Sequence, residues 1–364
     1  MTKGIIRTVA AIAATVFLTL QGAAYPGHSA QSALLMDADT GRVLFSDRAG
    51  TRSLIASTTK IMTAVVVLEH CDPDRTFQIP AEAVGIEGSS IYLKEGEELT
   101  IRQLLYGLML SSGNDAAVAL ALACSDSVPE FVDLMNLKAA ELELIHTHFE
   151  NPSGLDGDRH YSTAEDLGKL TAYALRNEEF LKIVSTRSIS FGGRCLQNHN
   201  KLLWNLDGCI GVKTGYTKAA GRILVSAAER NGRRLIAVTI CDGNDWKDHN
   251  SLYDYGFGLY SDELSIHKGD AVAEITLLDG SKAQLLAGEE FQLSGLSEDR
   301  LIVTPLHPKV FFQPGEPGTY AGFGAVKIGD RKLAEITLLW GGEVHEGTYT
   351  ENTVSPGLDL PESR

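Results

Sequence analysis

The chain has 364 residues, of which 44% are hydrophobic and 22% charged, a composition that excludes a disordered chain. Because one compact core rarely grows past about 250 to 300 residues, two domains are favoured. The formal net charge of -15 disfavours nucleic acid as a partner, since a nucleic-acid-binding face must be basic.

The first 24 residues predict a secretory signal. Lys3 and Arg7 are basic, an uncharged and mostly apolar run follows over 8–20, and small residues at 22–24 offer a cleavage site. The run is shorter than the roughly 20 apolar residues of a membrane-spanning helix, with an uncleaved anchor as the alternative. We therefore expect an exported protein that works outside the cytoplasm, in the periplasm, in the cell wall or secreted.

The segment after the signal predicts a hairpin followed by helices. Two short apolar runs joined by the turn sequence at 38–41 indicate the hairpin, and apolar residues at helical spacing indicate the first helix. In chain order, they predict a β-hairpin at 32–37 and 42–46, helices over 57–70, 101–110 and 115–123, and a helix that a capping box opens at Ser162-Thr163-Ala164-Glu165.

Three later segments predict antiparallel strands. They lie at 211–216, 222–229 and 234–241, and Asn231-Gly232 supplies the tight turn between the last two. The early hairpin can complete this sheet. We therefore expect one α+β domain over residues 31–260, an antiparallel sheet flanked by helices with a helical subdomain.

From Ser261 onward strands dominate, which predicts a small all-β domain over 261–345. Its residues 273–278 recur letter for letter at 334–339. Two copies are too few for a solenoid, so we interpret them as equivalent strands of one sandwich or barrel, each with a solvent face and a core face. The acidic, proline-containing segment 346–364 is expected to be a disordered tail.

Ser57 and Lys60 place a hydroxyl and an amine three residues apart at the start of a predicted helix, on one helical face. A serine nucleophile with a lysine base needs this arrangement. The positive end of the helix dipole and burial both favour the neutral amine, so Lys60 can act as a base near neutral pH. Alone the pattern is weak, because a serine helix cap with a surface lysine has the same spacing.

A second cluster, Ser112-Gly113-Asn114, lies between two predicted helices. There Ser112 can relay a proton and Asn114 can bind a substrate amide. A helix cap followed by an acidic residue is an equally natural interpretation of this cluster in isolation.

A third cluster, Lys213-Thr214-Gly215, lies on a predicted strand. Gly215 lets another backbone come close, and the strand edge can pair with an extended peptide. Lys213 would supply a positive charge for a substrate carboxylate.

Together and in this order, the three clusters are the signature of penicillin-binding proteins and class A β-lactamases. The sequence resembles the low-molecular-mass penicillin-binding proteins that are serine D-alanyl-D-alanine carboxypeptidases, peptidase family S11. The resemblance covers about residues 33–257 and implies a β-lactamase/transpeptidase-like domain, to which family members often add a small β-rich C-terminal domain. It also rests on Gly88-Ser89-Ser90, Asn151-Pro152-Ser153-Gly154-Leu155, His160-Tyr161-Ser162-Thr163-Ala164, Asn198-His199-Asn200 and Asp254-Tyr255-Gly256-Phe257.

The resemblance implies a mechanism without a cofactor. Ser57 would attack the penultimate D-alanine of a peptidoglycan pentapeptide ending in D-Ala-D-Ala, with Lys60 taking its proton. An acyl-enzyme would form, and β-lactam antibiotics would acylate the same serine. Ser112 would relay protons, and Asn114 would orient the peptide.

The resemblance also implies how the third cluster binds the substrate. Lys213 and Thr214 would bind the terminal carboxylate. The positive charge of Lys213 would also lower the pKa of Lys60 and so favour its neutral form. The backbone N–H groups of Ser57 and Tyr216 would form the oxyanion hole.

Three alternatives stay open. A β-lactamase shares the fold, but a class A enzyme needs a glutamate within E-x-x-L-N, and no such motif lies between Ser112 and Lys213. DD-endopeptidase or transpeptidase activity would use the same nucleophile. A non-catalytic cell-wall-binding protein is disfavoured, because a decayed site has no physical reason to keep both Ser57 and Lys60.

The sequence gives no catalytic role to its histidines and cysteines. A lysine base makes a histidine unnecessary, so His160 and His199 are expected at structural or groove-edge positions, with His199 the better candidate for a substrate contact. Paired histidine spacings are missing, so no metal is expected. Cys195 and Cys209 are the only two of five cysteines close in sequence, and whether they form a disulfide is open.

The end of the chain lacks the basic amphipathic helix that holds some family members on the membrane. We therefore expect a soluble exported enzyme, or one held only by an uncleaved leader. Peripheral association with the membrane or the cell wall and the oligomeric state are left open.

Overall fold

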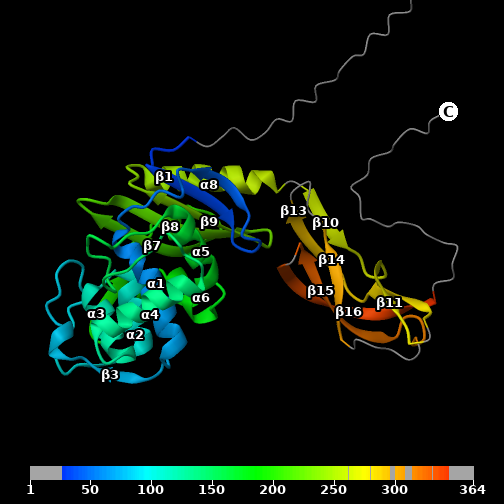
Figure 1. Ribbon diagram of the computed structural model, residues 1–364, viewed down its shortest axis with the longest axis horizontal. Helices are drawn as coiled ribbons and strands as arrows, with labels where there is room; N and C mark the ends of the chain where they lie inside the picture. Colours follow the sequence, from blue (N-terminus) through cyan, green and yellow to red (C-terminus); the bar gives the residue numbers. More distant parts are fainter. Residues whose placement is uncertain are drawn as a thin grey trace, which may run out of the picture.

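The computed structural model describes residues 27–260, 262–278, 280–295, 300–307, 314–329 and 331–343. The predicted signal over 1–24 and the predicted tail over 346–364 lie outside these ranges. Figure 1 shows a region of helices and sheet up to Tyr260 and an all-β region after it. Within the described ranges, every helix is too short or too polar to span a bilayer.

A five-stranded antiparallel sheet forms the centre of the first region. Its strands are β1 (Ser32–Asp37), β2 (Val43–Asp47), β7 (Cys209–Thr217), β8 (Gly221–Arg230) and β9 (Arg233–Ile240). Their order is β2-β1-β9-β8-β7, so the predicted hairpin completes the later sheet as expected. Asn231 and Gly232 both have positive φ in the turn between β8 and β9, which is the conformation that this turn sequence favours.

Both faces of this sheet are buried, because successive side chains of a strand point to opposite faces. Leu34 belongs to a large core that the sheet shares with the helices of residues 60–185. Its neighbour Leu35 belongs to a second core, together with Leu252 of α8 (Asp245–Leu259). In Figure 1, α8 accordingly lies on one side of the sheet and the helices α1 to α6 lie on the opposite side.

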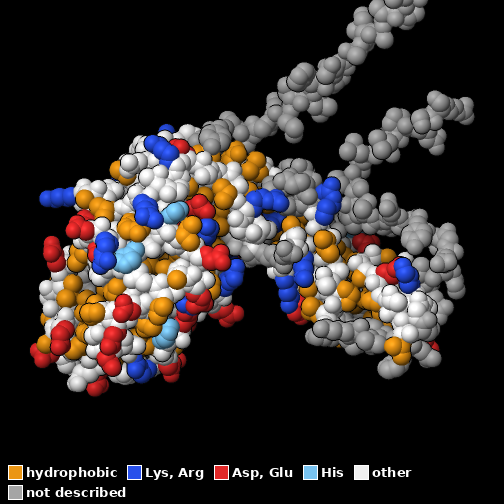
Figure 2. Space-filling view, in the orientation of Figure 1, with side chains coloured by type: hydrophobic (Ala, Val, Ile, Leu, Met, Phe, Trp, Pro, Cys, Tyr) orange, Lys and Arg blue, Asp and Glu red, His pale blue; other side chains and the backbone are white. Residues whose placement is uncertain are grey.

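The helices on the larger face form the predicted helical subdomain. They are the 3-10 turns η1 (Ala56–Thr59) and η2 (Ala81–Ala83) and the helices α1 (Lys60–His70), α2 (Ile101–Leu110), α3 (Asn114–Cys124), α4 (Val128–Glu141), α5 (Ala164–Ala174) and α6 (Glu178–Ser185). The short helix α7 (Leu202–Asn205) belongs to the other face, because Leu202 lies in the second core. Two short hairpins accompany them, β3 (Thr76–Gln78) with β4 (Glu98–Thr100) and β5 (Ser188–Phe191) with β6 (Arg194–Gln197). On the face that Figure 2 shows, Asp and Glu side chains gather over this helical end.

Two predicted helix starts are wrong. Residues 56–59 form a 3-10 turn, and the α-helix begins only at Lys60, because the N–H groups of Thr58 and Lys60 donate to the carbonyls three residues back, those of Ile55 and Ser57. The predicted capping box at Ser162 is displaced by one residue: Thr163 caps α5 by accepting the Asp166 N–H at 3.0 Å.

The all-β region consists of a five-stranded and a two-stranded sheet. Its strands are β10 (Asp262–Ile266), β11 (Ala271–Thr276), β12 (Lys282–Ala287), β13 (Phe291–Gly295), β14 (Ile302–His307), β15 (Tyr320–Ile328) and β16 (Arg331–Glu343). The larger sheet has the order β11-β12-β16-β15-β14, and β10 pairs with β13. The repeated segments fall on β11 and β16, the two neighbours of β12, with Glu274 and Glu335 exposed and Ile336 and Leu338 buried. The predicted α+β fold with an all-β C-terminal part is thus confirmed.

Candidate active site

The turn before α1 brings the hydroxyl of Ser57 to the amine of Lys60. Side chains three residues apart eclipse one another in a 3-10 turn, and Lys60 Nζ lies 3.0 Å from Ser57 Oγ. Thr58 fixes the turn, since its Oγ donates to the Ile55 carbonyl at 2.6 Å. Lys60 is completely buried. The structure thus brings the predicted nucleophile and base together.

Two oxygen atoms hold the other side of the Lys60 amine. Nζ lies 2.8 Å from Asn114 Oδ1 and 2.5 Å from the backbone carbonyl oxygen of Ser153. Burial and the positive charge of Lys213 hold the pKa of Lys60 well below its ordinary value. A neutral amine has two N–H groups and one lone pair, so these two acceptors leave the lone pair for the serine hydroxyl.

The contact with Ser153 depends on a loop to which the sequence motifs gave no role. Asn151 Oδ1 accepts the backbone N–H groups of residues 153–155 at 3.1, 2.7 and 3.2 Å, which fixes the loop. Gly154 has a φ of +87°, and a Cβ there would lie 1.9 Å from the carbonyl oxygen of Ala56. Only glycine lets the loop press against the nucleophile's turn at this point.

His160 supports the same turn as a neutral side chain. Its Nδ1 accepts the Glu150 N–H at 3.0 Å, so the ring proton is on Nε2 and donates to Thr59 Oγ at 2.7 Å. Burial lowers the pKa of His160 to about 4. Its side chain is buried rather than at the groove edge, which agrees with the structural interpretation.

Ser112 and Lys213 form a second hydroxyl–amine pair. Ser112 has a φ of +60°, rare for a residue with a side chain, and its Oγ lies 3.1 Å from Lys213 Nζ. The amine also donates to the Thr214 carbonyl at 2.8 Å. Burial lowers the pKa of Lys213 to about 7. Because Lys213 lies beneath the cleft wall, its direct contact with a substrate carboxylate stays a prediction.

Two glycines allow the walls of the site to approach closely. A Cβ at Gly88 would lie 2.6 Å from Nδ2 of Asn114, which donates to the Glu87 carbonyl at 2.6 Å. A Cβ at Gly215 would lie 3.2 Å from the Ile55 carbonyl oxygen and 3.3 Å from the Ser57 nitrogen. The predicted role of Gly215, close approach of backbones, agrees with this geometry.

A cleft of about 450 Å³ opens above these pairs. His199 lines it, with a pKa lowered by burial and by the Lys213 charge. Tyr216 is 65% exposed at its rim. The lining residues are Ser57, Ser89, Ser112, His199, Thr214, Gly215, Tyr216, Arg222, Ile223, Asp245 and Trp246.

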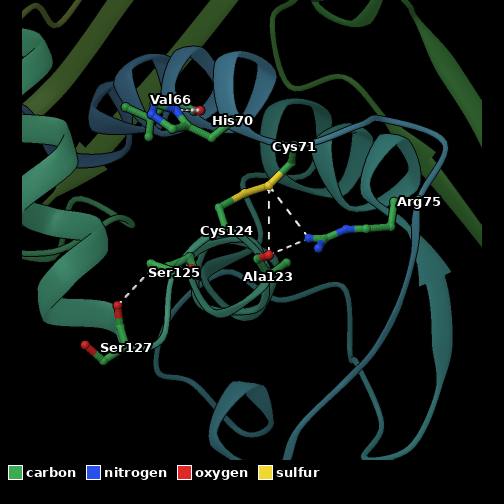
Figure 3. The surroundings of a disulfide bond; sticks show 9 residues. Val66, His70, Cys71, Arg75, Ala123, Cys124, Ser125 and Ser127 are labelled. Carbon is green, nitrogen blue, oxygen red and sulfur yellow. Dashed lines mark hydrogen bonds between the residues drawn. A yellow bond between two sulfur atoms is a disulfide. The ribbon is translucent and has the colours of Figure 1, made fainter.

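A disulfide joins α1 and α3, the helices that begin at the motif residues Lys60 and Asn114. Cys71 follows the last residue of α1, and Cys124 is the last residue of α3 (Figure 3). At the opposite ends of these two helices, Lys60 Nζ donates to Asn114 Oδ1 within the site. Cys195 and Cys209 are free, so the only pair close in sequence is not bonded.

Comparison with known proteins gives a consistent result. A family model described as D-alanyl-D-alanine carboxypeptidase matches residues 19–244. The chain is 35% identical to the D-alanyl-D-alanine carboxypeptidase DacF of Bacillus subtilis over 269 residues, which are 70% of this chain and 69% of the relative. The crystal structure of a D-alanyl-D-alanine carboxypeptidase from Mycobacterium tuberculosis is 36% identical with a TM-score of 0.63, covering 66% of this chain and 95% of that one.

The likeness of fold reaches the all-β region. The crystal structure of the carboxypeptidase DacD from Francisella tularensis matches with a TM-score of 0.62 at 24% identity. It covers 88% of this chain and 94% of that chain. The arrangement of helices, central sheet and C-terminal strands is therefore one that solved structures share.

Proposed function

The chain belongs to the D-alanyl-D-alanine carboxypeptidase family, peptidase family S11, and we propose that Ser57 is its nucleophile and Lys60 its base. It is a serine-type carboxypeptidase that removes the terminal D-alanine from peptidoglycan stem peptides through an acyl-enzyme, which β-lactams also form. The observation that carries the residue assignment is the buried Lys60 amine, held by Asn114 and Ser153 on two sides and by Ser57 on the third.

Acylation begins with the neutral Lys60 amine. It takes the Ser57 proton while Oγ attacks the carbonyl carbon of the penultimate D-alanine. The backbone N–H groups of Ser57 and Tyr216 stabilise the negative oxygen that develops, and the close approach at Gly215 supports this pairing of donors.

Collapse of the tetrahedral intermediate breaks the peptide C–N bond. The leaving nitrogen takes a proton through the Ser112 hydroxyl, which Lys213 re-supplies over the 3.1 Å contact. The proton that Lys60 took from Ser57 replaces the one that Lys213 gave, so Lys60 is neutral again before the ester is hydrolysed. Terminal D-alanine departs, and Ser57 keeps the acyl group as an ester. Water then attacks the ester carbon, loses its proton to the lysine base and returns the serine hydroxyl.

The proposed binding site of the substrate peptide is the edge of the central sheet. β7 is the last strand in the order of the sheet, so in the described residues its outer edge pairs with no further strand, and its residues 214–216 line the cleft. An extended stem peptide can add there as a further strand, with Thr214 at its carboxylate end and Asn114 and His199 along its side.

We also propose that the enzyme is exported and has two domains. Structural disulfides persist in oxidising compartments, so the Cys71–Cys124 bond supports the predicted signal over 1–24. The division near 260 is supported by the cores: two lie within residues 30–260, and a third lies within 266–340.

Intact mass spectrometry tests nucleophile and reaction together. Incubation with a penicillin should add one acyl group to the wild type and none to S57A. The untreated wild type should then convert a pentapeptide ending in D-Ala-D-Ala to the tetrapeptide and free D-alanine. A matched S185A variant, on an exposed serine at the end of α6 that does not line the cleft, should label normally.

The same measurement separates the alternatives. Rapid turnover of penicillin without an adduct would identify a β-lactamase. Joined peptides in the presence of an acceptor amine would identify a transpeptidase. Labelling of S57A would place the nucleophile elsewhere and overturn the assignment.

A further inference from the structure

The loop over residues 88–93 presents an aromatic ring to the solvent. Tyr92 is 81% exposed, the highest value among the exposed large hydrophobic side chains of the described residues. Its neighbours Ile91 and Leu93 are buried. Tyr92 also has a φ of +59°, a left-handed conformation that costs free energy in a residue with a bulky side chain. The neighbours therefore anchor the loop, whereas the Tyr92 ring itself contributes little to packing.

Asp115, in the first turn of α3, holds this loop from the inside. Its side chain is buried, and its carboxylate accepts the N–H groups of Ile91 and Leu93 at 3.1 Å. Asp115 Oδ2 also accepts the Ser90 hydroxyl at 2.6 Å, and Ser90 Oγ accepts the Tyr92 N–H at 2.9 Å. Three backbone N–H groups of the loop thus depend on one buried carboxylate, which offsets the strain at Tyr92.

Arg194, the first residue of β6, holds the same loop from the other side. Its Nε donates to the Ile91 carbonyl at 2.7 Å, and its Nη2 donates to the Tyr92 carbonyl at 2.9 Å. Glu97 fixes the guanidinium, since Nη1 and Nη2 donate to its two carboxylate oxygens at 2.5 and 2.6 Å. The backbone of Tyr92 is therefore held in place before a ligand arrives, which reduces the entropy lost on binding.

The loop reaches the catalytic cleft at Ser89. Ser89 lines the cleft together with Ser57, and its carbonyl accepts the Asn114 N–H at 2.7 Å. Tyr92 follows three residues later, so its Cα lies within about 11 Å of the Ser89 Cα. Tyr216 lines the cleft, whereas Tyr92 does not. The Tyr92 ring thus stands just outside the cleft that receives the peptide.

The substrate of the proposed function continues beyond its peptide. A stem peptide of peptidoglycan is cleaved at its carboxyl end and is attached by its other end to a glycan strand. Sugar rings carry C–H groups on their faces, which pack against the electron-rich face of an aromatic ring, and hydroxyl groups at their edges, which can bond with a phenol. An exposed, rigidly held tyrosine beside the cleft is therefore suited to a sugar of that strand.

We propose that the Tyr92 ring stacks against a sugar ring of the glycan strand that carries the stem peptide. This inference rests on the proposed function and adds a glycan contact outside the peptide site. The contact lies away from the bond that is broken, so Tyr92 is a binding residue and acts through the affinity for glycan-linked peptides.

The test compares two substrates that differ only in the sugar. One is a pentapeptide ending in D-Ala-D-Ala, and the other is the same peptide with the disaccharide unit of the glycan strand on its N-terminal end. Mass spectrometry quantifies the D-alanine released from each. In the wild type, kcat/KM should be about 3- to 10-fold higher on the disaccharide peptide, mainly through KM, and the ratio of the two values should fall to about 1 in Y92A.

Two further substitutions at Tyr92 and one elsewhere complete the comparison. Y92F keeps the ring and should keep the wild-type ratio. Y92N also removes the ring, and because asparagine tolerates a left-handed backbone, Y92N replaces Y92A if thermal unfolding shows that Y92A does not fold. Y320A is the matched control, since Tyr320 of β15 is 59% exposed in the all-β region. It should keep the wild-type ratio.

Each outcome decides the proposal. A ratio near 1 in the wild type, or a wild-type ratio in the folded variant without the ring, would overturn the sugar contact. An equal loss on both substrates keeps the ratio and would place Tyr92 in the peptide site instead. Loss of the ratio in Y92F would assign the contact to the hydroxyl and overturn stacking. If the wild type releases no D-alanine from either substrate, the proposed function fails, which is a separate result.

Discussion

The two regions of the molecule bury different kinds of side chains. In the catalytic region, the buried set includes Lys60, Lys213, His160 and His249, all paired or placed beside polar partners. In the described part of the chain after residue 260, every fully buried side chain is apolar. Polar burial is therefore confined to the region that holds the reaction.

The difference has a physical cause. Burying a polar group costs free energy unless its hydrogen bonds are remade, so a buried lysine persists only where several neighbours hold it. The catalytic region accepts that cost because a desolvated amine can act as a base. The all-β region needs only a stable sheet, for which alternating apolar side chains suffice. Substitutions should therefore affect catalysis strongly in the first region and stability alone in the second.

The largest effect is expected at Lys213. K213M removes a buried charge that lowers the pKa of Lys60 and also removes the partner of Ser112. The pKa of Lys60 should rise, and because the base must be neutral, the acid limb of the pH profile of kcat/KM should move to higher pH. At neutral pH we expect a loss of about 100-fold or more.

The measurement is kcat/KM for the pentapeptide across pH 5 to 10. The buffer contains about 0.15 M salt, which screens the surface charges. K218M is the control, since Lys218 is exposed on the turn after β7. An acid limb that stays in place in K213M would show that Lys213 does not set the protonation of the base.

An intermediate effect is expected at the disulfide. Replacing Cys71 and Cys124 together by alanine frees the ends of α1 and α3 and should lower the free energy of unfolding by about 2 to 4 kcal/mol. The Lys60–Asn114 contact at the opposite ends is also held by Ser153, so kcat/KM should stay within about threefold while the protein is folded.

Urea unfolding and the pentapeptide assay check this prediction. Alanine at the free, exposed Cys195 or Cys241 should change neither quantity. If activity collapses in the double variant while it remains folded, the covalent link positions the base, and the buried hydrogen bonds alone do not.

The sequence predicted the proposed nucleophile and base because their spacing carries the chemistry. Ser57 and Lys60 are three residues apart, and a turn of either helical type brings them together, so the mistaken α-helical start at Ser57 did not matter. The hairpin over β1 and β2 follows from two short apolar runs joined by a turn sequence, and the repeated strands β11 and β16 follow from their repeated sequence.

The rest of the site had no such signal. Ser153 contributes a backbone carbonyl, a group that every residue has. Arg222 and Asp245 are common residue types 23 positions apart, and only the fold brings them to one cleft. Five cysteines allow many pairings, and the bonded pair is separated by 53 positions, so spacing in the sequence left the pairing open.

The smallest effect on catalysis is expected in the all-β region. Trp340 of β16 is 5% exposed and belongs to its apolar core. W340A should lower the stability of this region by about 3 to 5 kcal/mol, because it removes a large buried side chain. F323A, on the neighbouring β15, is the control, since that ring is 48% exposed.

Catalysis should be unchanged in both variants, since the polar contacts of the site all lie before residue 260. Figure 2 shows an open space between the two regions on one face, which agrees with limited coupling. Calorimetry of W340A should show an earlier transition for the all-β region, with kcat/KM at wild-type level below it. A parallel loss of kcat/KM would mean that the contact of Leu293 with the turn at Gly232 transmits the damage to β8 and β9, and the two regions would then act as one.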